Sequence, residues 1–111
     1  MSHQKFQDCI DACVACALAC SHCATSCLQE EDVKMMSGCI QLDLECAAIC
    51  RASAEVMSLG SQFSAHLCRV CADVCKACGE ECAKHDMEHC QACAEACRKC
   101  AGVCEQMATA A

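Results

Sequence analysis

Cysteine is the residue type with the greatest capacity for chemistry in this chain, and it supplies 19 of the 111 residues. Most of the cysteines follow one another at steps of alternately four and three residues. This rhythm keeps side chains on one helical face, the face that a bundle turns inward. Thiols therefore occupy positions where a bundle normally carries leucine. The three longest runs are Cys9, Cys13, Cys16, Cys20, Cys23 and Cys27; Cys68, Cys71, Cys75, Cys78 and Cys82; and Cys90, Cys93, Cys97, Cys100 and Cys104.

The C-x-x-x-C spacing indicates metal binding rather than disulfide formation. Residues four apart on a helix have Cβ atoms about 5–6 Å apart, whereas a disulfide needs about 3.5–4.5 Å. Two such sulfurs can hold a metal ion between them. Cys39, Cys68 and Cys90 remain single, and we expect them to bridge neighbouring ions. The eight pairs are Cys9/Cys13, Cys16/Cys20, Cys23/Cys27, Cys46/Cys50, Cys71/Cys75, Cys78/Cys82, Cys93/Cys97 and Cys100/Cys104.

The density of thiols favours Cu(I) as the bound ion, with several ions per chain. Thiolates select soft ions, Cu(I) first, with zinc and iron–sulfur clusters behind. Four thiolates around Zn²⁺ leave two net negative charges, and several such sites are expensive to bury. A Cu⁺ ion matched to one thiolate is neutral, and an emptied thiol regains its proton and acts as a small hydrophobe. A zinc-binding thiolate domain is the alternative. The C-x-x-C-x-x-C run of iron–sulfur proteins is absent, as is its proline.

The composition predicts an all-α fold. The chain has no Pro, Trp or Tyr and only 4 Gly, which argues against a turn-rich β fold. Large apolar residues are few, so the core needs metal or disulfides to stabilise it. We expect helices over residues 2–29, 33–58, 61–84 and 87–107, with Gly60 ending the second and Ser61 and Asp86 capping the last two. Ser37-Gly38 either bends the second helix or marks a later start at Cys39. Short connections predict a single domain over residues 1–111, an antiparallel up-down-up-down four-helix bundle with a cysteine-lined core.

The charge balance excludes some partners. The net charge is −7, from 15 acidic and 8 basic residues, and without a basic run we expect no nucleic-acid partner. The chain has no uncharged apolar stretch of about 18 residues, so we expect no membrane span. The first residues lack the apolar run of a secretory signal, so we expect a cytoplasmic protein whose thiols stay reduced.

The two ends of the predicted bundle differ in composition. One end is apolar, and we expect it to be plugged; its residues are Phe6, Ile10, Met57, Leu59, Phe63, Leu67, Val103 and Met107. The other end carries Met and His, which are weak, exchangeable Cu(I) ligands, so we predict that copper enters and leaves there. The alternative is that these histidines are simply solvated. The residues of this second end are Glu30, Met35, Met36, His85, Met87 and His89.

Asp43 breaks the cysteine pattern. The rhythm from Cys39 through Cys46 to Cys50 places it on the inward face, where a carboxylate must be paired or protonated. It would then ligate a copper ion near the Met/His end or receive a thiol proton during loading. Alternatively, the second helix is rotated, with Leu42 turned inward.

Two other classes of function fit less well. A copper chaperone or sensor needs one or two accessible sites, and a sensor needs a basic DNA-binding face. A thiol enzyme needs an exposed thiolate beside a positive charge. Cys68 beside Arg69 and Cys97 beside Arg98 are poor candidates, because sequence neighbours on a helix point apart. We therefore expect no enzymatic activity.

The chain resembles the cytosolic branch of the bacterial four-helix-bundle copper storage proteins. The resemblance rests on the repeated C-x-x-x-C pairs, the segment Cys39-Ile40-Gln41-Leu42-Asp43-Leu44-Glu45-Cys46, and Lys84-His85-Asp86 followed by His89-Cys90. It implies a Cu(I) store that holds roughly one ion per cysteine. It also implies a homotetramer, with which the alanine-rich outer faces are compatible, and it allows a copper donor or acceptor protein as a partner.

Overall fold

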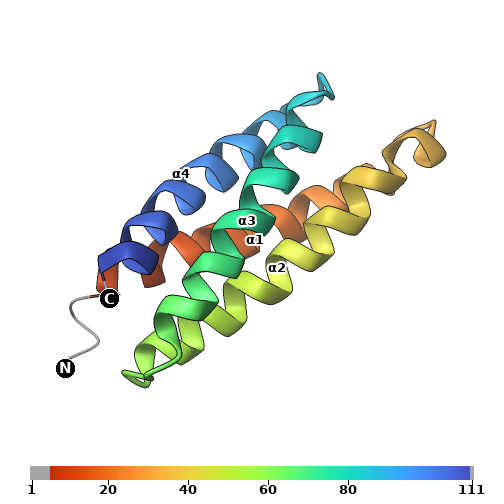
Figure 1. Cartoon of the computed structure of the whole chain (residues 1–111). Helices are drawn as coiled ribbons and strands as arrows, with labels where there is room; N and C mark the ends of the chain where they lie inside the picture. Colours follow the sequence, from red (N-terminus) through yellow and green to blue (C-terminus); the bar gives the residue numbers. More distant parts are fainter. Residues whose placement is uncertain (1–5, 111) are drawn as a thin grey trace.

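The computed structural model describes residues 6–110, which form a bundle of four long helices. The helices are α1 (Gln7–Cys27), α2 (Ser37–Ser58), α3 (Ser64–Ala83) and α4 (Glu88–Ala110), with a short 3₁₀ helix, η2 (Val33–Met36), before α2. Each helix runs antiparallel to the next, and α1 and α3 both pack against α2 and α4 (Figure 1). The bundle measures 48 × 19 × 17 Å. The predicted all-α up-down-up-down fold is confirmed, and residues 6–110 contain no strand.

Cysteine and alanine build the interior. All 19 cysteines are buried and free of disulfides, and buried alanines flank them on each helix. Such small side chains let the helices approach closely: a Cβ placed on Gly79 of α3 would lie 3.2 Å from the Cβ of Cys97 on α4. The largest fully buried side chains are Met36 and Met57. They lie near opposite ends of the bundle, so thiols fill the length between them.

The first two helices begin later than the sequence predicted. The range expected for the first helix began at residue 2, and residues 2–5 lie outside the described part of the chain; α1 spans Gln7–Cys27. Residues 33–36 form the 3₁₀ helix rather than the first turn of α2. The carboxylate of Asp32 accepts a hydrogen bond from the backbone N–H of Met35 at 3.2 Å, and this cap stabilises the separate short helix.

The turn between α2 and α3 corrects the expected apolar plug. Gly60 ends α2 as predicted, with a φ of 66° that glycine adopts readily. The Ser61 hydroxyl accepts a hydrogen bond from the backbone N–H of Phe63 at 3.0 Å, so it caps a turn, and α3 begins only at Ser64. Leu59 and Phe63 therefore lie outside the helices and are 72% and 58% exposed, which contradicts their predicted place in the plug. Phe6 and Met57 are buried as expected.

The last two helices also differ from the prediction at their ends. The third helix ends at Ala83, one residue before the expected Lys84, and α4 extends from Glu88 to Ala110, beyond the expected end at Met107. These shifts leave the cysteine faces unchanged.

Helix α1 is long and apolar enough to cross a membrane by length and composition, with a mean hydropathy of 1.4 over its most apolar window. This hydropathy comes largely from cysteine and alanine at positions that the bundle buries. Of that window, 44% is buried inside the bundle, and the helix also carries exposed apolar side chains such as Leu18.

Candidate metal centre

The sulfur atoms form a continuous column along the bundle axis. At the end where α1 begins and α4 ends, Cys9 Sγ lies 3.5 Å from Cys104 Sγ. Near the opposite end, Cys39 Sγ lies 3.2 Å from Cys82 Sγ. The neighbouring sulfurs recorded between these levels are 3.6–4.0 Å apart. We call the end with the α1–α2 loop and the α3–α4 turn the mouth; these two connections lie at the same end of the bundle (Figure 1).

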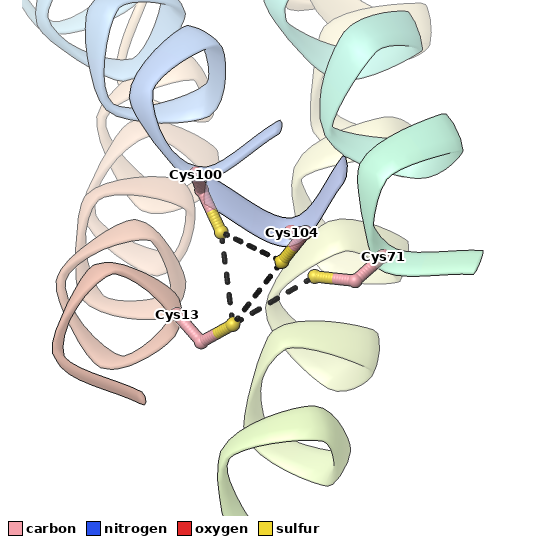
Figure 2. A group of neighbouring side chains, drawn as sticks. All are labelled: Cys13, Cys71, Cys100 and Cys104. Atoms are coloured by element: carbon pink, nitrogen blue, oxygen red, sulfur yellow. Dashed lines mark hydrogen bonds between the residues drawn. The ribbon is translucent and has the colours of Figure 1, made fainter. Parts of the chain in front are cut away.

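Each level of the column draws thiols from several helices. Figure 2 shows one level, in which Cys13 Sγ lies 3.7 Å from both Cys100 and Cys104 and 3.9 Å from Cys71. Five such groups of four, with all sulfurs within 4.8 Å of one another, are Cys13/Cys71/Cys100/Cys104, Cys16/Cys46/Cys50/Cys75, Cys16/Cys20/Cys46/Cys97, Cys20/Cys78/Cys93/Cys97 and Cys23/Cys27/Cys39/Cys90. Cys16, Cys20, Cys46 and Cys97 each belong to two of these groups. Neighbouring metal ions would therefore share thiolates.

The C-x-x-x-C pairs have the geometry that their spacing predicted. The sulfurs of Cys16/Cys20, Cys46/Cys50 and Cys100/Cys104 are each 3.9 Å apart. The sulfurs of a disulfide are about 2.05 Å apart. Two sulfurs that each lie about 2.3 Å from one metal ion can instead have the observed separation. Each of these three pairs can therefore hold an ion while staying reduced.

The sequence placed Met57 at the end opposite the mouth but did not indicate that its thioether would contact a thiol. Cys68 Sγ donates a hydrogen bond to Met57 Sδ at 3.6 Å. Continuing the rhythm of α2 beyond Cys50 leads to Ser53 and Met57, both fully buried. The same spacing that revealed the cysteines could also have placed Ser53 on the inward face.

Asp43 lies on the inward face of α2, fully buried, while Leu42 is only partly buried, so the rotated alternative is wrong. Its Oδ1 accepts hydrogen bonds from the thiols of Cys78 and Cys93, both at 3.2 Å, and of Cys82 at 3.4 Å. Burial raises the pKa of the Asp43 carboxyl to about 8. At neutral pH the metal-free protein therefore carries mostly a neutral acid here.

His89 brings a nitrogen to the sulfur column at the mouth. Its Nδ1 lies 3.5 Å from the sulfurs of Cys23 and Cys90 and 3.9 Å from that of Cys27. Its Nε2 lies 2.9 Å from Glu30 Oε2, in the loop that follows α1. The sequence placed Glu30 at this end without giving it a role. Burial raises the pKa of the Cys90 thiol to about 11, so this thiol is protonated when no metal is bound.

The other candidates at the mouth lie in different surroundings. His85 Nε2 is 3.0 Å from Glu81 Oε2, one turn earlier on α3. Met36 is buried, Met87 is partly buried against the core, and Met35 is 60% exposed. Of the Met and His residues predicted at the mouth, His89 is the one whose ring nitrogen lies 3.5–3.9 Å from cysteine sulfurs.

The fold and the column together define a class, the thiol-lined four-helix bundles that bind several soft metal ions. The family model described as copper storage protein matches residues 2–109. The chain belongs to the copper storage protein family.

Its relatives include proteins with bound copper. It is 51% identical over 83 residues to the uncharacterized cysteine-rich protein YhjQ of Bacillus subtilis (strain 168), covering 75% of this chain and 77% of that protein. The Cu(I)-bound copper storage protein BsCsp3 is 51% identical, with a TM-score of 0.90 over 93% of this chain and 97% of the other. A cytosolic copper storage protein from Streptomyces lividans, in a structure described as copper loading with five coppers, is 40% identical, with a TM-score of 0.92 over 96% of this chain and 94% of the other.

Proposed function

We propose that this chain stores Cu(I), with many cuprous ions bound by the thiolates of the core. The observation that carries the proposal is the continuous column of 19 buried, reduced cysteines. Each Cu⁺ balances the charge of one thiolate, so the column can fill without accumulating buried charge. The empty column consists of protonated thiols that pack as small hydrophobes, so the bundle keeps its fold in both states.

The number of ions follows from shared sulfurs. If every ion had four thiolates of its own, 19 cysteines could serve only a few ions. Because Cys16, Cys20, Cys46 and Cys97 each take part in two groups, a thiolate can bridge two ions. This sharing supports a capacity of roughly one ion per cysteine.

Copper enters and leaves at the mouth in this proposal. His89 offers a nitrogen beside Cys23 and Cys90, on a side chain that remains 15% exposed. His85, Met36 and Met87 lie at the same end and would act as auxiliary, exchangeable ligands. At the opposite end, the buried Phe6 and Met57 close the column.

Asp43 serves loading in one of two ways. Its carboxyl is in contact with four thiols, those of Cys39, Cys78, Cys82 and Cys93. With a pKa raised to about 8, the ionised fraction of the carboxyl can accept a proton as a thiol becomes a thiolate, or an oxygen can ligate an ion near the mouth. Both roles require the inward position of this side chain.

The assembly and the cellular setting are parts of the same proposal. Exposed apolar side chains on α1 and α2, among them Leu18 and Leu44, support packing of bundles against one another in a homotetramer. The cytosolic description of the Streptomyces relative supports a cytoplasmic protein that exchanges copper with a donor or acceptor. A thiol enzyme would need an accessible thiolate, and every cysteine here is buried, so we propose storage without catalysis.

The storage proposal is tested by anaerobic titration of the reduced protein with Cu(I) against a competing cuprous chelator. We expect saturation at roughly one ion per cysteine, with circular dichroism showing the same helicity in the empty and full protein. Saturation at one or two ions would instead support a chaperone. Preference for Zn²⁺ with folding only upon binding would support a zinc domain.

The uptake route is tested by the rate of copper loading. His89→Ala should slow loading from a Cu(I)–chelator complex and leave the final capacity nearly unchanged. His66→Ala is the matched control, because His66 is an exposed histidine near the start of α3, at the opposite end. Equal loading rates in the two variants would refute uptake through His89.

A further inference from the structure

Four potential ligands at the mouth form a nearly regular tetrahedron. They are the sulfurs of Cys23 and Cys27 on α1, the sulfur of Cys90 on α4, and the Nδ1 atom of its neighbour His89. The three sulfur–sulfur distances are 3.8, 3.9 and 3.9 Å. The nitrogen lies 3.5, 3.9 and 3.5 Å from the sulfurs of Cys23, Cys27 and Cys90.

These separations are close to those of a tetrahedral zinc site. With Zn–S near 2.3 Å and Zn–N near 2.05 Å, ideal tetrahedral ligands stand about 3.8 Å apart for two sulfurs and about 3.6 Å for sulfur and nitrogen. Five of the six observed distances lie within about 0.1 Å of these values, and the distance from Cys27 to His89 is longer by about 0.3 Å. Three cysteines and one histidine are also a common ligand set of structural zinc.

Glu30 gives the histidine the orientation that such a site requires. Its carboxylate oxygen lies 2.9 Å from Nε2, so the Nε2–H donates to Glu30 and the lone pair of Nδ1 is directed to the thiols. Metal-bound histidines typically hold a carboxylate in this way, which fixes the tautomer and raises the basicity of the ligating nitrogen. Glu30 is 31% exposed and His89 is 15% exposed, so the pair is held at the edge of the core.

The charge of this site is lower than that of a four-cysteine site. Three thiolates, a neutral histidine and Zn²⁺ leave one net negative charge. Cys90 and His89 lie in the first turn of α4, which begins at Glu88. The positive end of the helix dipole, roughly half a charge, partly offsets the remaining charge. Cys39 is not needed as a ligand and keeps its contact with Cys82 at 3.2 Å.

We propose that Cys23, Cys27, Cys90 and His89 bind one Zn²⁺ ion, or another thiophilic divalent ion, with Glu30 as the positioning residue. The site does not depend on copper storage. Where both ions are present, Cu(I) displaces the divalent ion, because thiolates favour the softer cation. Under the proposed uptake route, the bound Zn²⁺ would occupy the mouth until copper arrives.

The test uses the full, metal-free, reduced chain under anaerobic conditions. Zn²⁺ is titrated against a chromophoric zinc chelator, and Co²⁺ is titrated separately because its visible bands report tetrahedral geometry and thiolate ligation. We expect one tightly bound Zn²⁺ per chain and a tetrahedral Co²⁺ spectrum that changes in His89→Ala. Glu30→Gln should weaken zinc binding by about 10–100-fold, the usual effect of losing a carboxylate partner of a metal-bound histidine.

Two variants serve as controls. Glu81→Gln alters the other histidine–carboxylate pair of the mouth, that of His85, and His66→Ala removes an exposed histidine at the opposite end of the bundle. Both should keep the wild-type affinity of the zinc site. Weak binding by the wild type, several equivalent zinc ions per chain, or equal affinities of Glu30→Gln and Glu81→Gln would each overturn the proposal.

Folding and copper storage are checked separately. Circular dichroism verifies the helicity of each variant, and if Cys90→Ser disturbs the fold, the substitutions at His89 and Glu30 decide the question. The Cu(I) capacity of the same samples is measured independently. A chain that binds one zinc ion but few copper ions would refute copper storage and support the zinc site. A chain that fills with copper but does not bind zinc tightly would refute the zinc site and support storage.

Discussion

Asp43→Asn should remove a pH dependence from the stability of the metal-free protein. The ordinary pKa of this carboxyl is 3.8, and burial raises it to about 8 in the folded chain. Between these values the folded state holds a proton that the unfolded state has lost, so the free energy of unfolding falls as pH rises. The contribution is fully present below pH about 4 and is lost as pH rises through about 8. At about 1.4 kcal/mol per pKa unit, the whole effect is on the order of 6 kcal/mol.

The assay is urea unfolding of wild type and Asp43→Asn under anaerobic, reducing conditions with a metal chelator present. Every other titrating group is common to both proteins, so the difference between the two curves isolates Asp43. Between pH 5 and pH 7.5 the wild type should lose about 3 kcal/mol relative to the variant. Asp73→Asn, at an exposed position on α3, is the matched control and should follow the wild type. Parallel curves for wild type and Asp43→Asn would refute the buried, proton-holding carboxyl.

Two further predictions concern packing, and both are measured by urea unfolding of the reduced, metal-free protein. Met36→Ala should lower the free energy of unfolding by about 2–5 kcal/mol, because it leaves a cavity at a buried site. The control, Met35→Ala at an exposed site, should change it by less than about 0.5 kcal/mol. Equal effects of the two substitutions would contradict the burial of Met36. Gly102→Ala should stabilise the protein by about 0.5–1 kcal/mol, because an added Cβ there meets nothing within 4 Å. Gly79→Ala should destabilise it, because the new Cβ would crowd Cys97 at 3.2 Å; a gain equal to that of Gly102→Ala would contradict the tight contact between α3 and α4.

Much of this fold could be predicted because the cysteine pattern follows the helical period. A step of three or four residues determines which face a side chain occupies, so the rhythm alone identified the buried thiols. It offered an inward Asp43 as one of two alternatives, and the structure decides between them. The rhythm of α2 also continues to Met57, which the sequence indicated as apolar but not as a partner of Cys68.

Features that depend on more than one helix could not be predicted. The 3.2 Å approach of Cys39 to Cys82 depends on the stagger between α2 and α3, which a pattern within one helix does not specify. The exposure of Phe63 depends on a turn stabilised by Ser61. The pairing of Glu30 with His89 joins the loop after α1 to the first turn of α4, 59 residues along the chain.

The central claim, that the core thiols hold copper, is tested most directly by diffraction from crystals of the Cu(I)-loaded protein with data collected above and below the copper absorption edge. The account predicts anomalous peaks along the bundle axis, from the level of Cys9 and Cys104 to the level of Cys27 and Cys90, with sulfurs shared between neighbouring ions. Copper confined to one or two sites at the mouth or on the outer surface, with the remaining sulfurs free of metal, would contradict it.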